Sequence, residues 1–319
     1  MARALVTGAA GFIGSFVSEA LLARGWRVVG LDSFDPFYDP GVKRRNLRAC
    51  LANGRFRLAE TDIRDAEGVD RCMAEGIDVV VHLAALAGVR PSIERPVAYQ
   101  DVNVTGTCCL LEAARKHRVP RFVFASSSSV YGNNPKIPFA ETDNVDYPIS
   151  PYAASKKAGE LVCHTYHHLF GLDVTCLRLF TVYGPRQRPD LAIHKFARLI
   201  EAGRPITVFG DDSSMRDYTY IDDVVAGIMA AIERCRGYRI YNLGNSSPVS
   251  LKELVSAIEQ ALGKEAVVDR QPAQPGDVER TFADVSLARQ ELVYEPRTLL
   301  AEGLERFVDW LRSEGCLGS

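Results

Sequence analysis

Tyr152 and Lys156 stand four residues apart, 25 residues after Ser127 in a run of serines. On a helix, residues four apart lie on one face, so the lysine ammonium can act on the group that the tyrosine addresses. A free tyrosine keeps its proton up to pH of about 10, and a fixed cation nearby favours the phenolate. The pair therefore indicates a general base near neutral pH. Because such a pair also arises by chance, the surrounding sequence has to carry the assignment.

A glycine turn near the start of the chain, Gly8-x-x-Gly11-x-x-Gly14, lies between an expected strand at Ala4–Val6 and an expected helix that runs to Ala23. Glycines permit a tight turn there, and the free amides at the helix N-terminus can receive a pyrophosphate. The spacing differs from the commonest dinucleotide fingerprint, Gly-x-Gly-x-x-Gly. A glycine-rich turn without a ligand is the alternative.

Asp32 ends the second expected strand, Arg27–Leu31, where a carboxylate can accept hydrogen bonds from both hydroxyls of an adenosine ribose. Ser33 and Phe34 follow without an arginine that would receive a 2′-phosphate. The sequence therefore favours NAD over NADP as the cofactor. The alternative is that Asp32 is only a turn residue at the end of the strand. This alternative holds only if the glycine turn also binds no ligand.

Further cofactor contacts are expected where the third and fourth strands, Phe56–Ala59 and Val79–Leu83, end. Asp62 either borders the adenine or caps a helix, and His82 is more readily a packed core histidine than a catalyst. The expected cofactor-binding residues are Gly8, Gly11, Phe12, Ile13, Gly14, Asp32, Ser33, Asp62, Ile63, Leu83, Ala84 and Ala85, together with Tyr152 and Lys156. No metal is expected.

The elements that would position these residues alternate short β-branched runs with helical patterns, which is typical of a parallel sheet. Their nearly continuous apolar character predicts an α/β fold in which helices cover a doubly wound, Rossmann-type sheet on both faces. A polar loop is expected at Asp35–Arg48. The other elements expected in this half are helices at Val102–His117 and Tyr152–Phe170 and strands at Arg121–Ala125 and Val174–Leu179.

After Gly184-Pro185 the pattern changes to that of a smaller α/β substrate domain. Ser250 is expected to cap a helix that runs to Leu262, with Glu253 completing a capping box. The expected division is residues 1–183 for the NAD-binding domain, with about 217–245 returning to it, and 184–216 and 246–319 for a nucleotide-sugar-binding domain. Helices are also expected at Ile193–Ala202, Asp222–Glu233 and Leu299–Leu311, strands at Ile206–Phe209 and Tyr238–Leu243, and a loop at Gln271–Asp277.

The overall composition is that of an ordinary globular protein: 319 residues, 47% hydrophobic and 24% charged. A net charge of -2 gives no electrostatic reason to expect nucleic acid or an anionic membrane as partner. Eight cysteines without a C-x-x-C spacing favour a reducing compartment over a disulfide frame or a zinc site. With the first strand at about Arg3 and no apolar run near 18 residues, a cytoplasmic protein is expected.

Taken together, the ordered motifs are similar to those of the extended short-chain dehydrogenase/reductase family of nucleotide-sugar epimerases, dehydratases and decarboxylases. They are the glycine turn, Asp32, HLAA, Asn103-Val-Thr-Gly, SSSSVYG, Tyr152-x-x-x-Lys156, RLFTVYGP and RDYTYIDD. The resemblance implies that Tyr152 is the catalytic base, that Lys156 binds the nicotinamide ribose and tunes Tyr152, and that Ser127 hydrogen-bonds the reacting hydroxyl. It also implies a structural role for Asn103 and a diphosphate contact for Arg216.

Members of that family share the oxidation of the sugar 4-hydroxyl to a 4-keto sugar. Dehydratases of the family carry an Asp-Glu pair before Val-Tyr-Gly, and its decarboxylases carry a Glu there; here the two places hold Ser128 and Ser129. Neither serine is an acid or base near neutral pH without help. Elimination is therefore disfavoured, and epimerisation at C4 is the predicted reaction.

The segments Asp32–Arg44, Thr181–Pro185 and Arg188–Phe196 resemble those of UDP-glucuronate 4-epimerases most closely. The predicted reaction is the NAD-dependent conversion of UDP-glucuronate to UDP-galacturonate. Hydroxyls of Ser128, Ser129 and Thr181 could hold the C6 carboxylate, or instead bond to backbone at the strand ends. Arg188 is expected to contact uridine or phosphate, and the expected substrate-binding residues are Ser128, Ser129, Thr181, Arg188, Arg216 and Asp277.

The alternatives are a UDP-glucose or UDP-N-acetylglucosamine 4-epimerase, then a UDP-glucuronate decarboxylase. A non-catalytic NAD-binding regulator would be expected to lose Tyr152 or Lys156, and both are present. By resemblance, helices at Val102–His117 and Tyr152–Phe170 pair into the four-helix interface of a homodimer.

Overall fold

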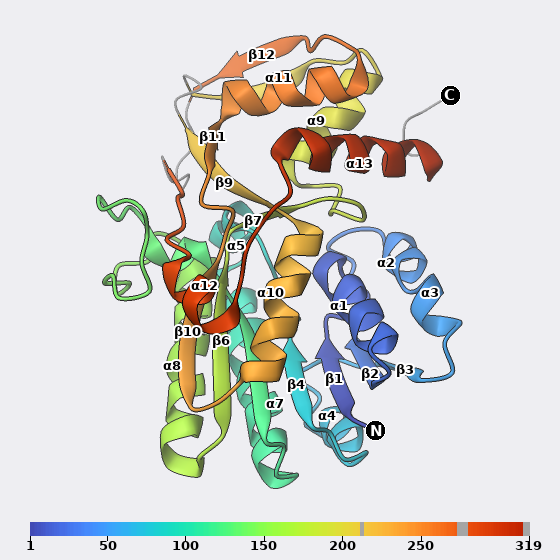
Figure 1. Ribbon diagram of the computed structural model, residues 1–319, viewed down its shortest axis with the longest axis vertical. Coiled ribbons are helices and arrows are strands. Elements are labelled where there is room, and N and C mark those ends of the chain that lie inside the picture. The colour runs from blue at the N-terminus through green and yellow to red at the C-terminus, as the bar shows by residue number, and fades with distance from the viewer. Residues whose placement is uncertain (211–213, 273–279, 315–319) are drawn as a thin grey trace.

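A seven-stranded parallel sheet forms the centre of the protein (Figure 1). The computed structural model describes residues 1–210, 214–272 and 280–314. Strand order is β10-β6-β5-β4-β1-β2-β3, and every pair is parallel. The predicted α/β, Rossmann-type doubly wound sheet is thereby confirmed. The strands are β1 (Arg3–Thr7), β2 (Arg27–Asp32), β3 (Phe56–Glu60), β4 (Val79–His82), β5 (Arg121–Ser127), β6 (Asp173–Leu179) and β10 (Tyr238–Leu243).

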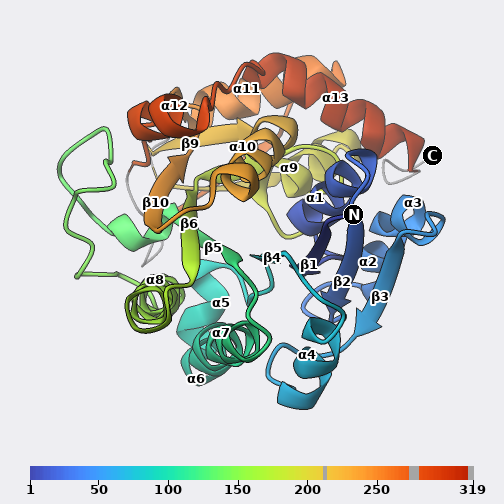
Figure 2. The same ribbon diagram turned by 60° about the horizontal axis from the view of Figure 1, so that its bottom comes forward.

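Helices cover both faces of this sheet, as Figure 2 shows. On one face lie α1 (Phe12–Ala23) and α10 (Ile221–Arg234), and on the other α4 (Ala66–Met73), α7 (Gly106–Lys116) and α8 (Pro151–Phe170). Successive strand residues alternate between the faces, so Ala4 and Val6 join one buried cluster and Leu5 joins the other. Both faces are therefore apolar, which explains the continuous hydrophobic runs in the sequence.

The carboxyl ends of β1 and β4 form the switch point of the sheet, because β1 lies between β2 and β4. Chain segments leave this point in opposite directions and open a crevice there. Short helices follow the strands at this edge and in the connections nearby. They are α2 (Pro40–Asn46), α3 (Arg48–Leu51), α5 (Val89–Glu94), α6 (Pro96–Gln100), the π turn η1 (Asp101–Thr105) and the 3-10 turn η2 (Ser128–Tyr131).

The polar loop expected at Asp35–Arg48 was wrong for half of its length, since α2 occupies Pro40–Asn46. Asp39 caps this helix by accepting a hydrogen bond from Gly41 N at 2.8 Å. Pro40 stands in the first turn, where its missing N–H is tolerated. An Asp-Pro start was thus the local signal of the helix.

Two smaller sheets lie beyond the carboxyl edge of the main sheet (Figure 1). One has the order β11-β9-β7, and the other pairs β8 with β12. The predicted capping box is confirmed: Ser250 Oγ accepts from Glu253 N at 3.2 Å, and Glu253 accepts from Ser250 N at 2.8 Å. The elements are β7 (Thr181–Tyr183), α9 (Ala192–Glu201), β8 (Ile206–Phe209), β9 (Met215–Tyr220), β11 (Pro248–Ser250), α11 (Leu251–Leu262), β12 (Val268–Gln271), α12 (Ser286–Leu292) and α13 (Leu300–Ser313).

The predicted domain division stays a proposal. β10 joins the main sheet beside β6 and α10 packs against α1, as a return of the chain to the first domain would require. β9 spans Met215–Tyr220, across the expected boundary near residue 217.

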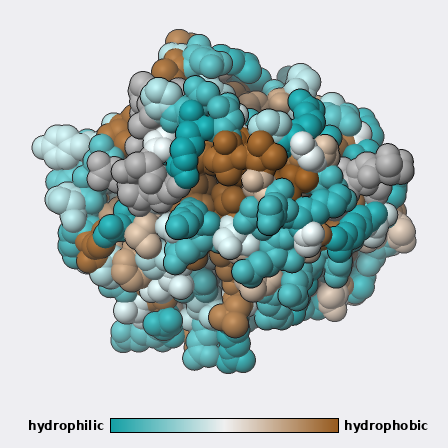
Figure 3. Space-filling model, turned by 90° about the horizontal axis from the view of Figure 1, so that it is seen from above, coloured by the Kyte–Doolittle hydropathy of each residue, from teal (hydrophilic) through white to brown (hydrophobic). Residues whose placement is uncertain are grey.

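Seen from the end that carries the small sheets, hydrophobic residues gather in the middle of the surface with polar ones around them (Figure 3). Within the described residues, no helix has the length and hydropathy needed to cross a membrane.

Candidate active site

A cavity of about 440 Å³ opens at the carboxyl edge of the main sheet, and residues 179–182, Arg188 and Leu191 also line it. Its volume lies within the roughly 300–1,000 Å³ typical of small-molecule sites. It brings together residues from β2, β5, β6 and β7, from the turns that follow β1, β3 and β4, and from α8. Every residue that the sequence assigned to the cofactor lines it: Gly8, Gly11, Phe12, Ile13, Gly14, Asp32, Ser33, Asp62, Ile63, Leu83, Ala84, Ala85, Tyr152 and Lys156.

The glycine turn is shaped so that two of its positions accept no side chain. Gly8 has a φ of +68°, and a Cβ there would lie 2.9 Å from Ala84 N. A Cβ on Gly14 would lie 2.0 Å from Gly8 O. Gly11 is the N-cap of α1, whose first amides lie at the cavity without intrahelical partners. A backbone cradle at a helix N-terminus is the arrangement that binds a pyrophosphate.

Gly14→Ala is therefore expected to weaken dinucleotide binding by more than about tenfold, because the backbone must shift to relieve the contact with Gly8 O. Titration calorimetry with NAD measures the effect. Gly54→Ala is the matched control, since a Cβ at Gly54 meets nothing within 4 Å. Unchanged affinity in the Gly14 variant would contradict the assigned cradle.

The Asp32 carboxylate is held between two backbone amides: it accepts from Ala10 N at 3.0 Å and from Phe34 N at 2.9 Å. Burial raises its pKa, against the lowering effect of these two bonds and of Lys43. Lys43 is itself buried and donates to Asp35 O at 2.7 Å. Each carboxylate oxygen keeps a second lone pair for a ribose hydroxyl, so the site fits the adenosine end of a dinucleotide.

Local contacts bear on the roles left open for Asp62 and His82. The N-cap of α4 is Asp65, which accepts from Gly68 N at 3.1 Å, so Asp62 does not cap that helix. Asp62 instead pairs with Arg64 at 2.7 Å beside the cavity. His82 is buried between the hydroxyls of Thr7 and Thr107, at 2.8 Å and 2.9 Å. Burial lowers its pKa to about 3, so it is the neutral core histidine that was expected.

The start of α8 is fixed by Asn103 in the π turn η1, a kind of irregularity found often at functional sites. Asn103 accepts from Leu86 N at 2.8 Å and donates to Leu86 O at 3.0 Å. It also donates to Ser155 Oγ at 2.9 Å, and Ser155 donates to Tyr152 O at 2.8 Å. Asn103 thus links the loop after β4 to the helical turn that carries Tyr152.

Tyr152 directs its hydroxyl to Ser127, and its ring packs edge-on against Tyr99 with centroids 6.2 Å apart. Burial raises the pKa of Tyr152, while the hydrogen bond with Ser127 and the charge of Arg188 lower it. Arg188 was expected to contact substrate only; its effect on Tyr152 was not anticipated. Lys156 is buried and donates to Ala125 O at 2.8 Å, and burial lowers its pKa to about 8.

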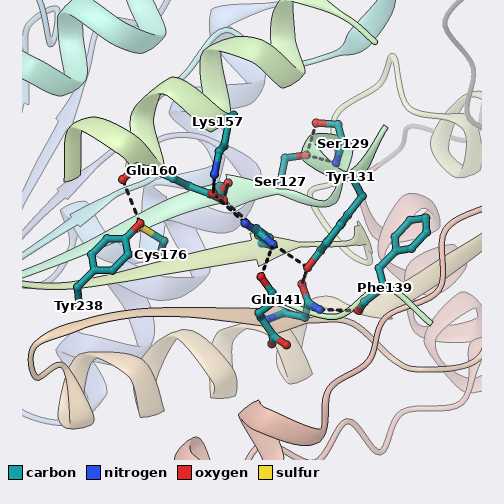
Figure 4. Close-up of polar contacts among 12 residues, drawn as sticks. Ser127, Ser129, Tyr131, Phe139, Glu141, Lys157, Glu160, Cys176 and Tyr238 are labelled. Atoms are coloured by element: carbon teal, nitrogen blue, oxygen red, sulfur yellow. Dashed lines mark hydrogen bonds and ion pairs between the residues drawn. The ribbon is translucent and has the colours of Figure 1, made fainter. Parts of the chain in front are cut away.

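The expected substrate residues fall into three groups. Ser128, Thr181 and Arg188 line the cavity. Ser129 is outside the described lining; it donates to Ser127 Oγ at 2.8 Å, as Figure 4 shows. Arg216 on β9 is likewise outside that lining and donates to Met215 O at 2.9 Å. Asp277 lies outside the residues that the structure describes.

Sequence reasoning did not assign to the site several residues of the segment after β2. Phe37, Tyr38 and Lys43 line the cavity, and Arg188 lies over the Phe37 ring at 5.2 Å. This segment therefore reaches from the Asp32 end of the cavity to the Tyr152 end. The local signals were the Asp39-Pro40 helix start and the resemblance of Asp32–Arg44 to UDP-glucuronate 4-epimerases. The contact with Arg188 joins residues about 150 positions apart and has no local signature.

Fold and cavity together define a Rossmann-type dinucleotide-binding protein with a Ser-Tyr-Lys set at the end of its cavity. The chain belongs to the NAD dependent epimerase/dehydratase family, whose sequence profile matches residues 4–244. A UDP-glucuronate 4-epimerase from Thermodesulfobacterium geofontis is 43% identical over 309 residues, 96% of this chain and 95% of that protein.

Two solved structures extend the comparison. The UDP-glucuronic acid 4-epimerase of Bacillus cereus, in complex with UDP-glucuronic acid and NAD, is 38% identical with a TM-score of 0.92 over 98% of this chain and 99% of that one. The UDP-glucose 4-epimerase of Thermus thermophilus, in complex with NAD, is 36% identical with a TM-score of 0.89 over 97% of this chain and 99% of that one.

Proposed function

We propose that the protein is a nucleotide-sugar 4-epimerase that interconverts UDP-glucuronate and UDP-galacturonate with NAD. The observation that carries the proposal is the end of the cavity, where Tyr152 and Ser127 lie beside two further hydroxyls, Ser128 and Thr181. Serines stand at the two positions that hold acidic residues in dehydratases. Relatives that bear the name UDP-glucuronate 4-epimerase align over nearly the whole chain.

In this proposal Tyr152 takes the proton of the sugar 4-hydroxyl while Ser127 holds the reacting oxygen. NAD supplies the acceptor for the hydride that leaves C4 and the donor for its return. Rotation of the 4-keto sugar before that return inverts C4, and Tyr152 then gives its proton back to the new hydroxyl. Because the same tyrosine serves both directions, the cycle needs no second acid or base.

The carboxylate of the substrate makes this keto sugar fragile, since it is a β-keto acid. If the C5–C6 bond aligns with the carbonyl π system, carbon dioxide leaves, the electron pair forms an enolate, and protonation at C5 followed by reduction gives a UDP-pentose. Hydrogen bonds from Ser128 and Thr181 would hold the carboxylate out of that alignment. The two hydroxyls carry no charge, so they would orient the carboxylate through the direction of their hydrogen bonds and not as a cation would.

The direct test is incubation of the purified protein with UDP-glucuronate and NAD, followed by nuclear magnetic resonance of the products. UDP-galacturonate is the expected product. A UDP-pentose without UDP-galacturonate would replace the proposal by a decarboxylase. Faster turnover of UDP-glucose or UDP-N-acetylglucosamine than of UDP-glucuronate would favour the neutral-sugar epimerases, for which the Thermus thermophilus structure is the precedent.

Ser128→Ala and Thr181→Ala are expected to raise the share of UDP-pentose among the products, by about tenfold for a lost hydrogen bond to a charged group. Both residues line the cavity. Thr165→Ala is the control, because it removes an exposed hydroxyl on α8 and should leave the ratio unchanged. An unaltered ratio in both cavity variants would remove the assigned carboxylate contact.

We also propose that the protein is a homodimer. Leu161, Leu169 and Phe170 on α8 are exposed large hydrophobic residues, which supports a homodimer built on α7 and α8. Sedimentation analysis tests it, with Leu161→Glu expected to yield monomers. A cytoplasmic location also remains a prediction.

A further inference from the structure

A buried ion pair joins Glu160 on α8 to Arg178 on β6, and each side chain is 1% exposed. Two parallel hydrogen bonds form it, Nε to Oε1 at 2.9 Å and one terminal nitrogen to Oε2 at 3.0 Å (Figure 4). Removing two charges from water is costly, so such a pair is weak evidence for stability as its purpose. Neither residue belongs to the described lining of the cavity. A role of the pair therefore has to act through the segments to which it is bonded.

On one side the pair holds the end of β5. Ser126 donates to Glu160 Oε1 at 2.6 Å. One helical turn earlier on α8, Lys156 donates to Ala125 O at 2.8 Å. Two successive residues of β5 are thus bonded to α8 side chains immediately before Ser127, the partner of Tyr152.

On the other side the pair holds the end of η2. Arg178 donates to the Tyr131 hydroxyl at 3.0 Å, and that hydroxyl donates to Asn242 Oδ1 at 2.7 Å. Arg178 also donates to Glu141 O at 3.3 Å. Asn242 in turn donates to Phe139 O at 2.8 Å, so Tyr131 is anchored to the loop before α8 and to β10.

We propose that Glu160 and Arg178 act as a positioning unit that clamps residues 126–131 at both ends and keeps Ser127 and Ser128 stationary during turnover. The inference rests on the proposed function. When the keto sugar rotates within the cavity, the hydroxyls of Ser127 and Ser128 keep their positions if residues 126–131 are anchored. If that segment were loose, the hydroxyls would move with the sugar. The clamp would therefore set the fraction of turnovers that lose carbon dioxide.

The first test is Glu160→Gln, which keeps the shape of the side chain but turns one of its two acceptors into a donor facing Arg178. We expect epimerisation kcat to fall by about tenfold to a hundredfold, as for a small displacement of reacting groups. The UDP-pentose share should rise about as much, with KM and NAD affinity nearly unchanged. Product ratios come from nuclear magnetic resonance, and affinity from calorimetry.

A double variant, Glu160→Met with Arg178→Met, covers the case in which the single variant does not fold, because apolar replacement of a buried pair often preserves the site. Lys157, which lies 3.6 Å from Glu160 Oε2, is partly exposed and can turn its ammonium to water. Tyr238→Phe is the matched control: Tyr238 donates to the backbone carbonyl of Glu160 at 3.0 Å, outside the clamp. It should leave the product ratio unchanged.

The outcomes separate the two proposals. If the unmodified protein makes no UDP-galacturonate, the proposed function fails before any variant is made. If it does, and the folded Glu160 variants keep both its product ratio and its kcat, the clamp is overturned. Lower stability and lower kcat at an unchanged ratio would also overturn it, because that is the signature of a purely structural pair.

Discussion

Tyr152→Phe is expected to lower turnover by at least about 10² to 10⁴, the usual contribution of a general acid–base group, while NAD binding is preserved. The substitution removes only the hydroxyl that bonds to Ser127. The ring can keep its edge-on packing against Tyr99, and therefore the shape of the cavity. Product formation from UDP-glucuronate and calorimetric titration with NAD measure the two properties separately.

Tyr99→Phe is the control for this result. Tyr99 neighbours Tyr152, but its hydroxyl donates to Ala87 O at 3.0 Å and is not assigned to the chemistry. Activity within a few fold of the unmodified protein is expected for it. Full activity in Tyr152→Phe would show that another group removes the proton, and loss of NAD binding there would show that the hydroxyl has a role in holding the cofactor.

The sequence was most informative where structure depends on local rules. The glycine turn, the carboxylate at the end of β2 and the Tyr-Lys pair on α8 can each be recognised from a few neighbouring residues. The residues of all three line the cavity. The strands of the main sheet were also predicted to within about two residues, most readily for inner strands such as β1 and β4, which are buried on both faces and nearly continuously apolar.

What could not be predicted depends on contacts between distant residues. β12 is exposed along its length and owes its existence to pairing with β8, about 60 residues earlier. Arg188 acts on Tyr152 from another part of the chain. Ser129 shows the same limit: the pattern grouped it with Ser128, but its hydroxyl is bonded to Ser127. Neighbours in sequence on a 3-10 turn point in different directions, which spacing alone does not resolve.

Lys156→Met is expected to have opposite effects on stability and activity. Burial lowers the pKa of Lys156 from 10.5 to about 8, so below pH 8 the folded protein carries a charge that it disfavours by about 3 kcal/mol. Methionine removes this cost but also the bond to Ala125 O, worth about 1 kcal/mol. At pH 7 the cofactor-free variant should therefore be more stable by about 2 kcal/mol in denaturant unfolding.

The pH dependence of that difference tests its cause. Because the unfolded chain binds the proton of Lys156 more tightly than the folded one, the stability contributed at this site rises with pH between about 8 and 10.5. The advantage of Lys156→Met should shrink over the same range, while turnover of the variant stays at least about a hundredfold low for want of the cation. A difference that does not change with pH would mean that Lys156 is not a strained buried charge. A cation retained at such a cost, bonded to the strand end before Ser127, fits the proposed role of Lys156 toward the cofactor and Tyr152.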